Sequence, residues 1–301
     1  MYTQNEIMEK VEKFIQAEGS QNAACAKMGV SPSVISAVRK GNYTGNTEKI
    51  FAKLADYFGV KAQAELTYTE IEYAETYISS QVYKIIRTAQ IKGGLAVACG
   101  DAGIGKTKAI KKYIADHQNS ICITVNPCLS SVKAILNMIA DRIGVTSEKS
   151  RDKLWLGIVG KLKDGMVLIF DESQHLTFKT IEVLRSFSDY FADKGQTLGI
   201  VFIGNSETVN KMGIKKAEFA QVLSRTKQTK IYTTANVTRE DIKKLFPIIA
   251  EQDKEIDFLL RIAQTRQAVR GAVNLFSNAY DNENISYAGL VAMAKFMEMD
   301  F

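Results

Sequence analysis

Residues 100 to 107 read GDAGIGKT and fit the phosphate-binding pattern G-x-x-x-x-G-K-[ST] at every fixed position. The apolar run 95–99 precedes them and a stretch of helical composition, 108–114, follows. The loop therefore lies where a strand enters a helix, so that backbone N–H groups and the positive end of the helix dipole converge on an anion. These residues predict a nucleoside triphosphate site.

The whole loop is assigned to nucleotide binding. Its eight residues are Gly100, Asp101, Ala102, Gly103, Ile104, Gly105, Lys106 and Thr107. The glycines lack a Cβ and let the backbone curl closely round the phosphates. Lys106 is expected to contact the β and γ phosphates, and the hydroxyl of Thr107 is expected to ligate Mg²⁺.

Two carboxylates follow a second apolar run. Residues 166–170 read MVLIF, which is typical of a central parallel strand, and Asp171 and Glu172 come directly after it. The carboxyl ends of parallel strands form the edge where the phosphates bind. We expect Asp171 to hold Mg²⁺ with Thr107, and Glu172 to polarise the attacking water as a general base. The pair predicts hydrolysis in addition to binding.

Four further residues are candidates for the same chemistry. Asn205 follows the apolar run 198–203 and either positions the hydrolytic water or serves only as a turn residue; the strand order favours the first role. Arg225 ends the amphipathic stretch FAQVLSR and either projects toward a neighbouring subunit's γ phosphate or lies on the surface. Arg266 and Arg270 lie four residues apart on one helical face, which either closes over the nucleotide or is solvated.

Strand-like and helical stretches alternate over residues 81–235, which predicts an α/β domain with a parallel sheet. The expected strands are 95–99, 121–125, 167–170, 198–203 and 230–233. Residues 236–301 return to helical periodicity after the capped start VTRED and are expected to form a C-terminal helical lid. Residues 61–80 are polar, contain no Pro or Gly run, and are interpreted as a partly helical connector.

Residues 1–60 are expected to form a small all-α domain with helix-turn-helix spacing at Gln21, Cys25, Gly29, Val30 and Ile35. Its second helix begins at Ser31 and Pro32, ends near Lys40, and has four candidate DNA-contacting residues: Ser31, Ser33, Arg39 and Lys40. Val34 and Val38 are expected to point outward with them. The domain has seven basic and six acidic residues, so we expect weak DNA binding by it alone. A protein-contact role is the alternative.

The composition narrows the class of protein. With 46% hydrophobic and 24% charged residues in 301, the chain has the composition of a soluble globular protein. No stretch is long enough to span a bilayer and MYTQNEIMEK is not a signal peptide, so we expect a cytoplasmic protein. Because the four cysteines are scattered and the sequence has two histidines, we do not expect zinc chemistry.

The net charge of +6 suggests an acidic partner. One basic cluster contains Lys149, Arg151 and Lys153, and a second lies between residues 211 and 230. Each cluster is either a DNA-contacting surface or a solvated charged face. We name the residues of the first cluster as candidate DNA contacts.

The segments GDAGIGKT, VLIFDESQHL, VFIGN, VLSR and AVRGAVNLF resemble, in this order, the Walker A, Walker B, sensor 1, arginine-finger and sensor 2 elements of AAA+ ATPases. The resemblance covers about residues 70–280. The DESQHL form, the small size and the helix-turn-helix in front are similar to the transposition ATPases typified by protein B of bacteriophage Mu. Sensor 2 often has Gly just before its arginine region, whereas this chain reads Gln267-Ala268-Val269-Arg270; Arg270 is preferred over Arg266 as its arginine.

The resemblance implies an ATP- and Mg²⁺-dependent ATPase in which Glu172, Asn205 and Arg225 are catalytic. It also implies a homo-oligomer, a filament or ring on double-stranded DNA, that recruits and stimulates a DDE-type transposase of a phage or mobile element and is released by hydrolysis. A helicase-loader ATPase and a nucleotide-regulated helix-turn-helix repressor are the alternatives. A repressor would give base-specific footprints, and a loader would bind a replicative helicase.

Overall fold

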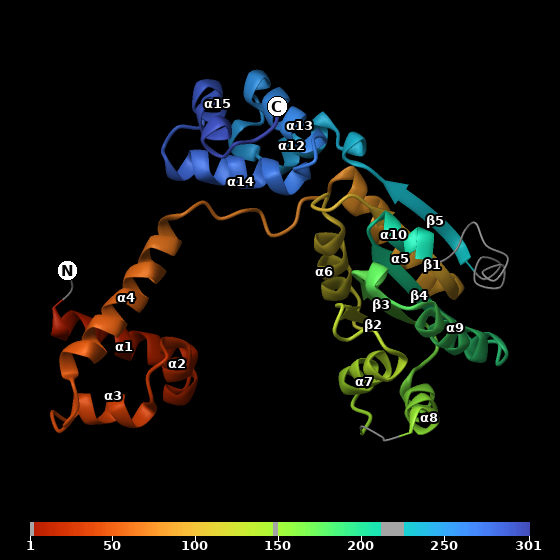
Figure 1. The fold of residues 1–301 in the computed structure, drawn as a ribbon, viewed down its shortest axis with the longest axis horizontal. Helices are drawn as coiled ribbons and strands as arrows, with labels where there is room; N and C mark the ends of the chain where they lie inside the picture. Colours follow the sequence, from red (N-terminus) through yellow and green to blue (C-terminus); the bar gives the residue numbers. More distant parts are fainter. Residues whose placement is uncertain (1–2, 147–149, 212–225) are drawn as a thin grey trace. The chain divides into compact units, whose positions relative to one another are not determined.

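The structure is a computed structural model that describes residues 3–146, 150–211 and 226–301 (Figure 1). The chain divides into two compact units, Met1–Thr69 and Glu70–Phe301. The N-terminal unit consists of α1 (Gln4–Glu18), α2 (Gln21–Met28), α3 (Pro32–Arg39) and α4 (Thr47–Leu66). Its helices begin at side chains that accept a backbone N–H, as at Ser20 for α2 and Ser31 for α3.

The three-residue turn between α2 and α3 explains why these helices pack as a pair. Gly29 ends α2 with φ 65°, a conformation that favours glycine. Gln21, the first residue of α2, donates from Nε2 to the carbonyl of Pro32 at 2.9 Å and to Oγ of Ser36 at 3.0 Å. A core contributed by all four helices and the turn lies beneath them, formed by Ile7, Val11, Phe14, Ala24, Cys25, Met28, Val30, Ile35, Phe51, Leu54 and Phe58.

The second unit is built on a five-stranded parallel sheet in the order β2-β3-β4-β1-β5. Its strands are β1 (Gly94–Gly100), β2 (Ser120–Thr124), β3 (Met166–Asp171), β4 (Leu198–Gly204) and β5 (Thr226–Tyr232). The predicted α/β class with a parallel sheet is therefore confirmed. β5 begins four residues before the expected start, because its first residues, of which Thr226, Gln228 and Thr229 pair with buried β1, are polar and carry no apolar signal of their own.

Helices cover both faces of the sheet. α5 (Tyr77–Lys92) packs on β1 and β4 and on α6 (Lys106–Asp116). The other face meets α7 (Val132–Ile143), α8 (Arg151–Lys161) and α9 (Phe178–Ala192), and alternate strand residues such as Leu168 and Phe170 enter the core on that side. Burial on both faces explains why β1, β3 and β4 are continuous apolar runs in the sequence.

The residues after the sheet are helical, as the sequence predicts, and form the blue helices of Figure 1. They are α12 (Arg239–Leu245), α13 (Asp253–Gln264), α14 (Ala268–Asp281) and α15 (Tyr287–Phe296), with short 3₁₀ turns η3 (Thr234–Asn236) and η4 (Pro247–Ile249). The expected capped start of α12 is present, since Thr238 and Asp241 form a reciprocal capping box.

The predicted connector 61–80 contains the end of α4 and the beginning of α5. Its residues from Glu70 onward belong to the second unit, where α12 holds them. The N–H of Tyr77 donates to Oδ1 of Asp241 at 2.6 Å, and Nζ of Lys244 donates to the carbonyl of Glu75 at 2.8 Å. Within the described residues, no helix has both the length and the apolar character that crossing a membrane requires.

Candidate nucleotide site

The loop between β1 and α6 has the backbone of an anion cradle. Gly105 begins α6 with φ 98° and has no side chain to cap the helix, so the first N–H groups of α6 face the loop. Gly100 allows β1 to approach β5 closely, because a Cβ there would lie 2.2 Å from the carbonyl oxygen of Tyr232. The loop is also fixed by the turn η3 that follows β5: Oδ2 of Asp101 accepts the N–H of Thr234 at 2.8 Å. The Asp101 carboxylate therefore supports the loop from outside the cradle.

Lys106, Thr107 and Asp171 lie together beneath this loop. Nζ of Lys106 donates to the carbonyl oxygens of Gly100 at 2.9 Å and Asp101 at 2.6 Å. Oγ1 of Thr107 donates to Oδ2 of Asp171 at 2.9 Å, which joins the loop to the end of β3 as the sequence predicts.

Burial shifts both charged groups toward their neutral forms. It lowers the pKa of Lys106, although the carboxylates of Asp171 and Glu172 oppose the shift. It raises the pKa of Asp171, although the Thr107 hydroxyl that donates to it acts in the other direction. A perturbed lysine and a perturbed carboxylate beside a cradle for anions form a site suited to binding and chemistry.

Glu172 lies at the mouth of the site. It is exposed and has φ 56°, a left-handed conformation that is uncommon for a residue with a side chain. Nε2 of Gln174 donates to Oε2 of Glu172, and Oε1 of Gln174 accepts the N–H of Asn205 at 3.2 Å. The side-chain oxygen of Asn205 itself accepts the N–H of Glu207 at 2.9 Å, at the start of α10 (Ser206–Lys211). Sequence reasoning missed Gln174, whose only signal is its place two residues after the acid pair.

The C-terminal helices complete the site. A cavity of about 520 Å³ is lined by the loop, by Glu172, by connector residues near Glu70 and by α14 residues that include Arg270. The N–H of Arg270 donates to the carbonyl of Gly103 at 3.1 Å. Arg266 instead forms an ion pair with Asp300 at 2.7 Å, with 78% of its side chain exposed. Arg266 lies in the turn before α14, so the prediction that the two arginines share one helical face is wrong. Of the two, Arg270 is the one at the cavity.

The segment Gln267-Ala268-Val269-Arg270 lacks the glycine that often precedes the sensor 2 arginine, and the structure explains how alanine fits there. Ala268 begins α14 with φ 55°, in the left-handed region that glycine adopts most readily. Its side chain is buried against Gly103, where an added Cβ would lie 3.3 Å from that of Ala268. The position thus has a glycine-type backbone, and its methyl group fills the space that Gly103 leaves.

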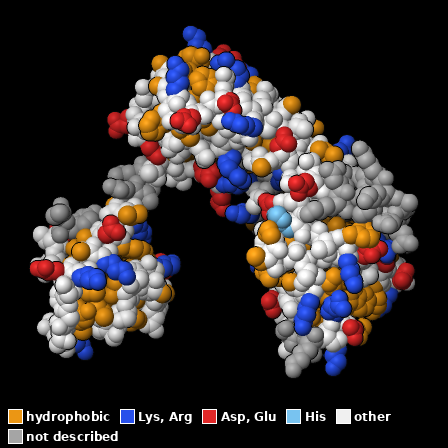
Figure 2. Space-filling view, viewed as in Figure 1, with side chains coloured by type: hydrophobic (Ala, Val, Ile, Leu, Met, Phe, Trp, Pro, Cys, Tyr) orange, Lys and Arg blue, Asp and Glu red, His pale blue; other side chains and the backbone are white. Residues whose placement is uncertain are grey.

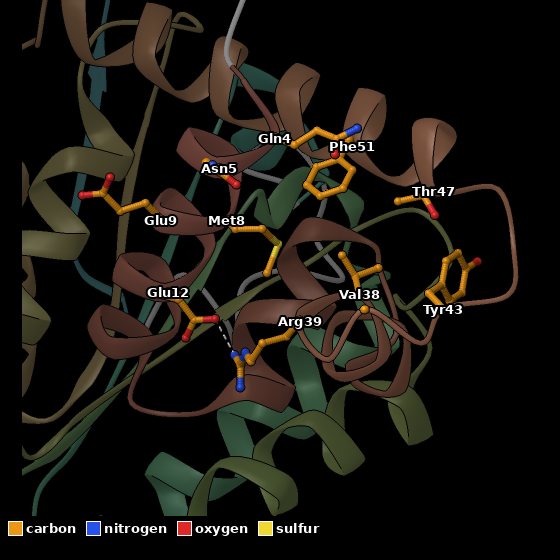
Figure 3. A pocket seen from close by; sticks show the side chains of 11 residues that line it. Gln4, Asn5, Met8, Glu9, Glu12, Val38, Arg39, Tyr43, Thr47 and Phe51 are labelled. Carbon is orange, nitrogen blue, oxygen red and sulfur yellow. Dashed lines mark ion pairs between the residues drawn. The ribbon is translucent and has the colours of Figure 1, made fainter.

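The candidate DNA-contacting residues of α3 differ in their surroundings. Arg39 forms an ion pair with Glu12 at 2.6 Å beside a cavity of about 710 Å³ between α1 and the beginning of α4, shown in Figure 3. Ser31, Ser33 and Lys40 are exposed, as is part of Arg39.

Val34 and Val38 are partly buried against the N-terminal core. The prediction that they point outward is wrong, because this short helix needs more than Ile35 to bury an apolar face.

The basic clusters are only partly within the described residues. Arg151 and Lys153 are exposed on α8, and Lys227 and Lys230 are exposed on β5. Lys149 and Arg225 lie outside the described residues. On the face drawn in Figure 2, basic and acidic side chains of the described residues are interspersed. Charge alone therefore does not select one DNA-contacting surface.

A β2-β3-β4-β1-β5 parallel sheet, a phosphate loop after β1, an acid pair after β3 and an arginine-bearing helical lid define the AAA+ class of P-loop ATPases. The sequence profile of the family described as AAA domain matches residues 90–212. Two solved structures share the fold: the Aeropyrum pernix ORC2 protein (TM-score 0.55, 13% identity, 72% of this chain and 66% of that chain) and Pyrobaculum aerophilum Cdc6p (TM-score 0.51, 18% identity, 69% and 62%).

Relatives in sequence are more specific. The chain is 30% identical over 286 residues to the Mu-like prophage FluMu DNA transposition protein B of Haemophilus influenzae. This alignment covers 92% of this chain and 96% of that protein. It is 29% identical over 248 residues to the ATP-dependent target DNA activator B of Escherichia phage Mu, covering 80% and 77%. The chain belongs to the family of transposition B proteins, as its sequence resemblance predicts.

Proposed function

We propose that the chain is a Mg²⁺-dependent ATPase that assembles on target DNA in its ATP-bound form, delivers that DNA to a transposase, and leaves after hydrolysis. The observation that carries the proposal is the similarity to transposition protein B over 92% of the chain. The adjacency of the phosphate loop and the acid pair supports the chemical part.

The charges of the site suit hydrolysis of a nucleotide phosphoanhydride. Lys106 lies within the loop and would neutralise charge on the terminal phosphates. Glu172, at the mouth of the cavity, would accept the proton of the attacking water. Arg270 reaches the cavity from the lid, so lid position and phosphate binding would be linked.

Thr107 and Asp171 form the donor set that fits a magnesium ion. A hydroxyl and a carboxylate oxygen lie 2.9 Å apart beside the phosphate loop, and Mg²⁺ prefers oxygen donors of these two kinds together with phosphates. The ion would supply positive charge to the phosphate oxygens. The raised pKa of Asp171 and the lowered pKa of Lys106 both reflect burial that a bound ion and phosphates would offset.

Similarity to the transposition B proteins supports assembly and DNA binding, which complete the proposal. Exposed basic residues on α3, α8 and β5 offer phosphate contacts without a fixed base-reading set. Arg225 is proposed to complete the pocket of a neighbouring subunit, which would make hydrolysis depend on assembly. We also propose that Asn205 positions the attacking water.

The test measures binding to random-sequence duplex and phosphate release in parallel. We expect the parent protein to bind duplex tightly with ATP and weakly without it, and to lose affinity steeply between about 50 and 200 mM salt. Lys106→Ala should not bind ATP and should bind duplex only as weakly as the parent protein without ATP, whereas Glu172→Gln should bind both tightly and hydrolyse ATP about a hundredfold more slowly. Equal affinity for duplex with and without ATP would refute the coupling, and base-specific footprints would indicate a repressor instead.

Assembly is tested by mixing Arg225→Ala with Lys106→Ala. Each variant should be inactive alone, because one lacks the arginine and the other lacks an intact pocket. If the arginine acts on a neighbouring subunit, the mixture should recover part of the activity. No recovery in confirmed mixed assemblies would remove Arg225 from this role.

A further inference from the structure

Among the residues that the structure describes, Gln174 is the side chain that hydrogen-bonds to the carboxylate of Glu172. Gln174 lies in the 3₁₀ turn η1 (Ser173–His175), directly after the acid pair, and is 6% exposed. Its Nε2 donates to Oε2 of Glu172, and its Oε1 accepts the N–H of Asn205 at 3.2 Å. A single amide group thus links the proposed base to the end of β4.

The orientation of this amide is determined by its partners. A backbone N–H can only donate, so the Gln174 atom that faces Asn205 must be the oxygen. The NH₂ group then necessarily faces Glu172 and donates to its carboxylate. An amide with both ends engaged and little exposure has one stable position, which fixes where the carboxylate oxygen lies.

The surrounding backbone leaves room for this arrangement and for little else. A Cβ at Gly204 would lie 2.4 Å from Oε1 of Gln174 and 2.4 Å from Oγ1 of Thr208. Ser173 holds the same turn to β4 by a separate contact, donating from Oγ to the carbonyl of Ile203 at 2.9 Å. The turn is therefore anchored by Ser173, and Gln174 is left to contact Glu172.

We infer that Gln174 is a positioning residue for ATP hydrolysis: its amide holds the Glu172 carboxylate in place and ties it to the segment that begins at Asn205. The inference rests on the proposed role of Glu172 as base. The two hydrogen bonds of this amide set the position of the carboxylate relative to the end of β4.

The test replaces the donor and keeps the shape. Gln174→Glu retains an oxygen that can accept from Asn205 but places a carboxylate, which cannot donate when ionised, against Glu172. We expect kcat for ATP hydrolysis with saturating duplex to fall about tenfold or more, with the Kd for ATP changed by less than about twofold. Gln174→Met, which removes both contacts with little change of volume, should show the same split.

Two controls separate positioning from structure. Ser173→Ala loosens the same turn without touching Glu172 and should keep kcat within about threefold of the parent value. In a Glu172→Gln background, Gln174→Glu should cause no further loss, because residues that act as a unit are not additive.

Each outcome bears on one conclusion. A parent-like kcat in Gln174→Glu, or an equal loss in Ser173→Ala, would overturn the role of Gln174. An additive loss in the double variant would do the same. If instead Glu172→Gln itself hydrolyses ATP normally, the proposed base is wrong, and that result is read from the single variant without reference to Gln174.

Discussion

The contact between the phosphate loop and the lid predicts an unusually large cost for Gly103→Ala. Gly103 has φ 77°, and an added Cβ would lie 3.1 Å from Cβ of Arg270 and 3.3 Å from Cβ of Ala268. The left-handed backbone costs an alanine about 1–2 kcal/mol. The restricted unfolded chain returns about 0.4–1 kcal/mol. The neighbouring atoms must also shift to accommodate the two close contacts, which costs a further 1–3 kcal/mol, roughly. The three terms sum to an expected loss of about 1–4.5 kcal/mol in the free energy of unfolding.

Gly165→Ala is the matched control. Gly165 has φ 75°, and a Cβ there would meet nothing within 4 Å, so the backbone penalty is the same and the contacts are absent. Its expected cost is about 1 kcal/mol. Trp155, the only tryptophan, stacks on Phe187 with ring centroids 5.4 Å apart and therefore reports unfolding of the second unit in urea.

A second substitution tests the contact directly. Ala268→Gly removes the methyl that faces Gly103, so it should recover part of the loss in a Gly103→Ala background. In the parent protein it should be nearly neutral, because relief of the left-handed alanine at φ 55° opposes the lost burial of a methyl group, worth about 0.8 kcal/mol. Equal losses for Gly103→Ala and Gly165→Ala, or no coupling with Ala268→Gly, would refute the reasoning.

Three further outcomes can be checked with single measurements. Asp241→Ala should destabilise the second unit by about 1–3 kcal/mol in urea unfolding, because this buried carboxylate accepts backbone N–H groups that would lose their partner. A change below about 0.5 kcal/mol, the size expected of a surface substitution, would contradict this. Arg266→Ala should leave ATP turnover within about twofold, since its exposed pair with Asp300 is worth little, and a large loss would show that the wrong arginine was placed at the site. In native protein at pH 8, iodoacetamide should label the exposed Cys128 well before Cys122. Burial raises the pKa of the Cys122 thiol to about 11, and its reactive thiolate appears only as the pH rises toward that value. Mass spectrometry that shows Cys122 labelled first would contradict this expectation.

Local sequence determined the central strands and the two chemical motifs. Continuous apolar runs identified β1, β3 and β4, because strands buried on both faces of a parallel sheet exclude polar residues, whereas the polar first half of β5 carries no such signal. The loop pattern located Lys106 and Thr107, and the position of Asp171 after an apolar run placed it opposite them, since parallel strands end at one edge. These features depend on backbone conformation and burial, which short segments encode.

Partners distant in sequence were decided only by the tertiary structure. The choice between Arg266 and Arg270 depends on where α14 begins: Arg266 lies in the turn before the helix and Arg270 on the helix beside the loop, whereas periodicity alone placed both on one helical face. Val34 and Val38 point inward because the N-terminal core lies on that side of α3. The hydrogen bond from Asn205 to Gln174 joins two residues that are 31 positions apart in the chain and that follow the ends of β4 and β3. Each of these depends on how elements pack, and a side chain's partner is fixed by packing geometry that no local pattern contains.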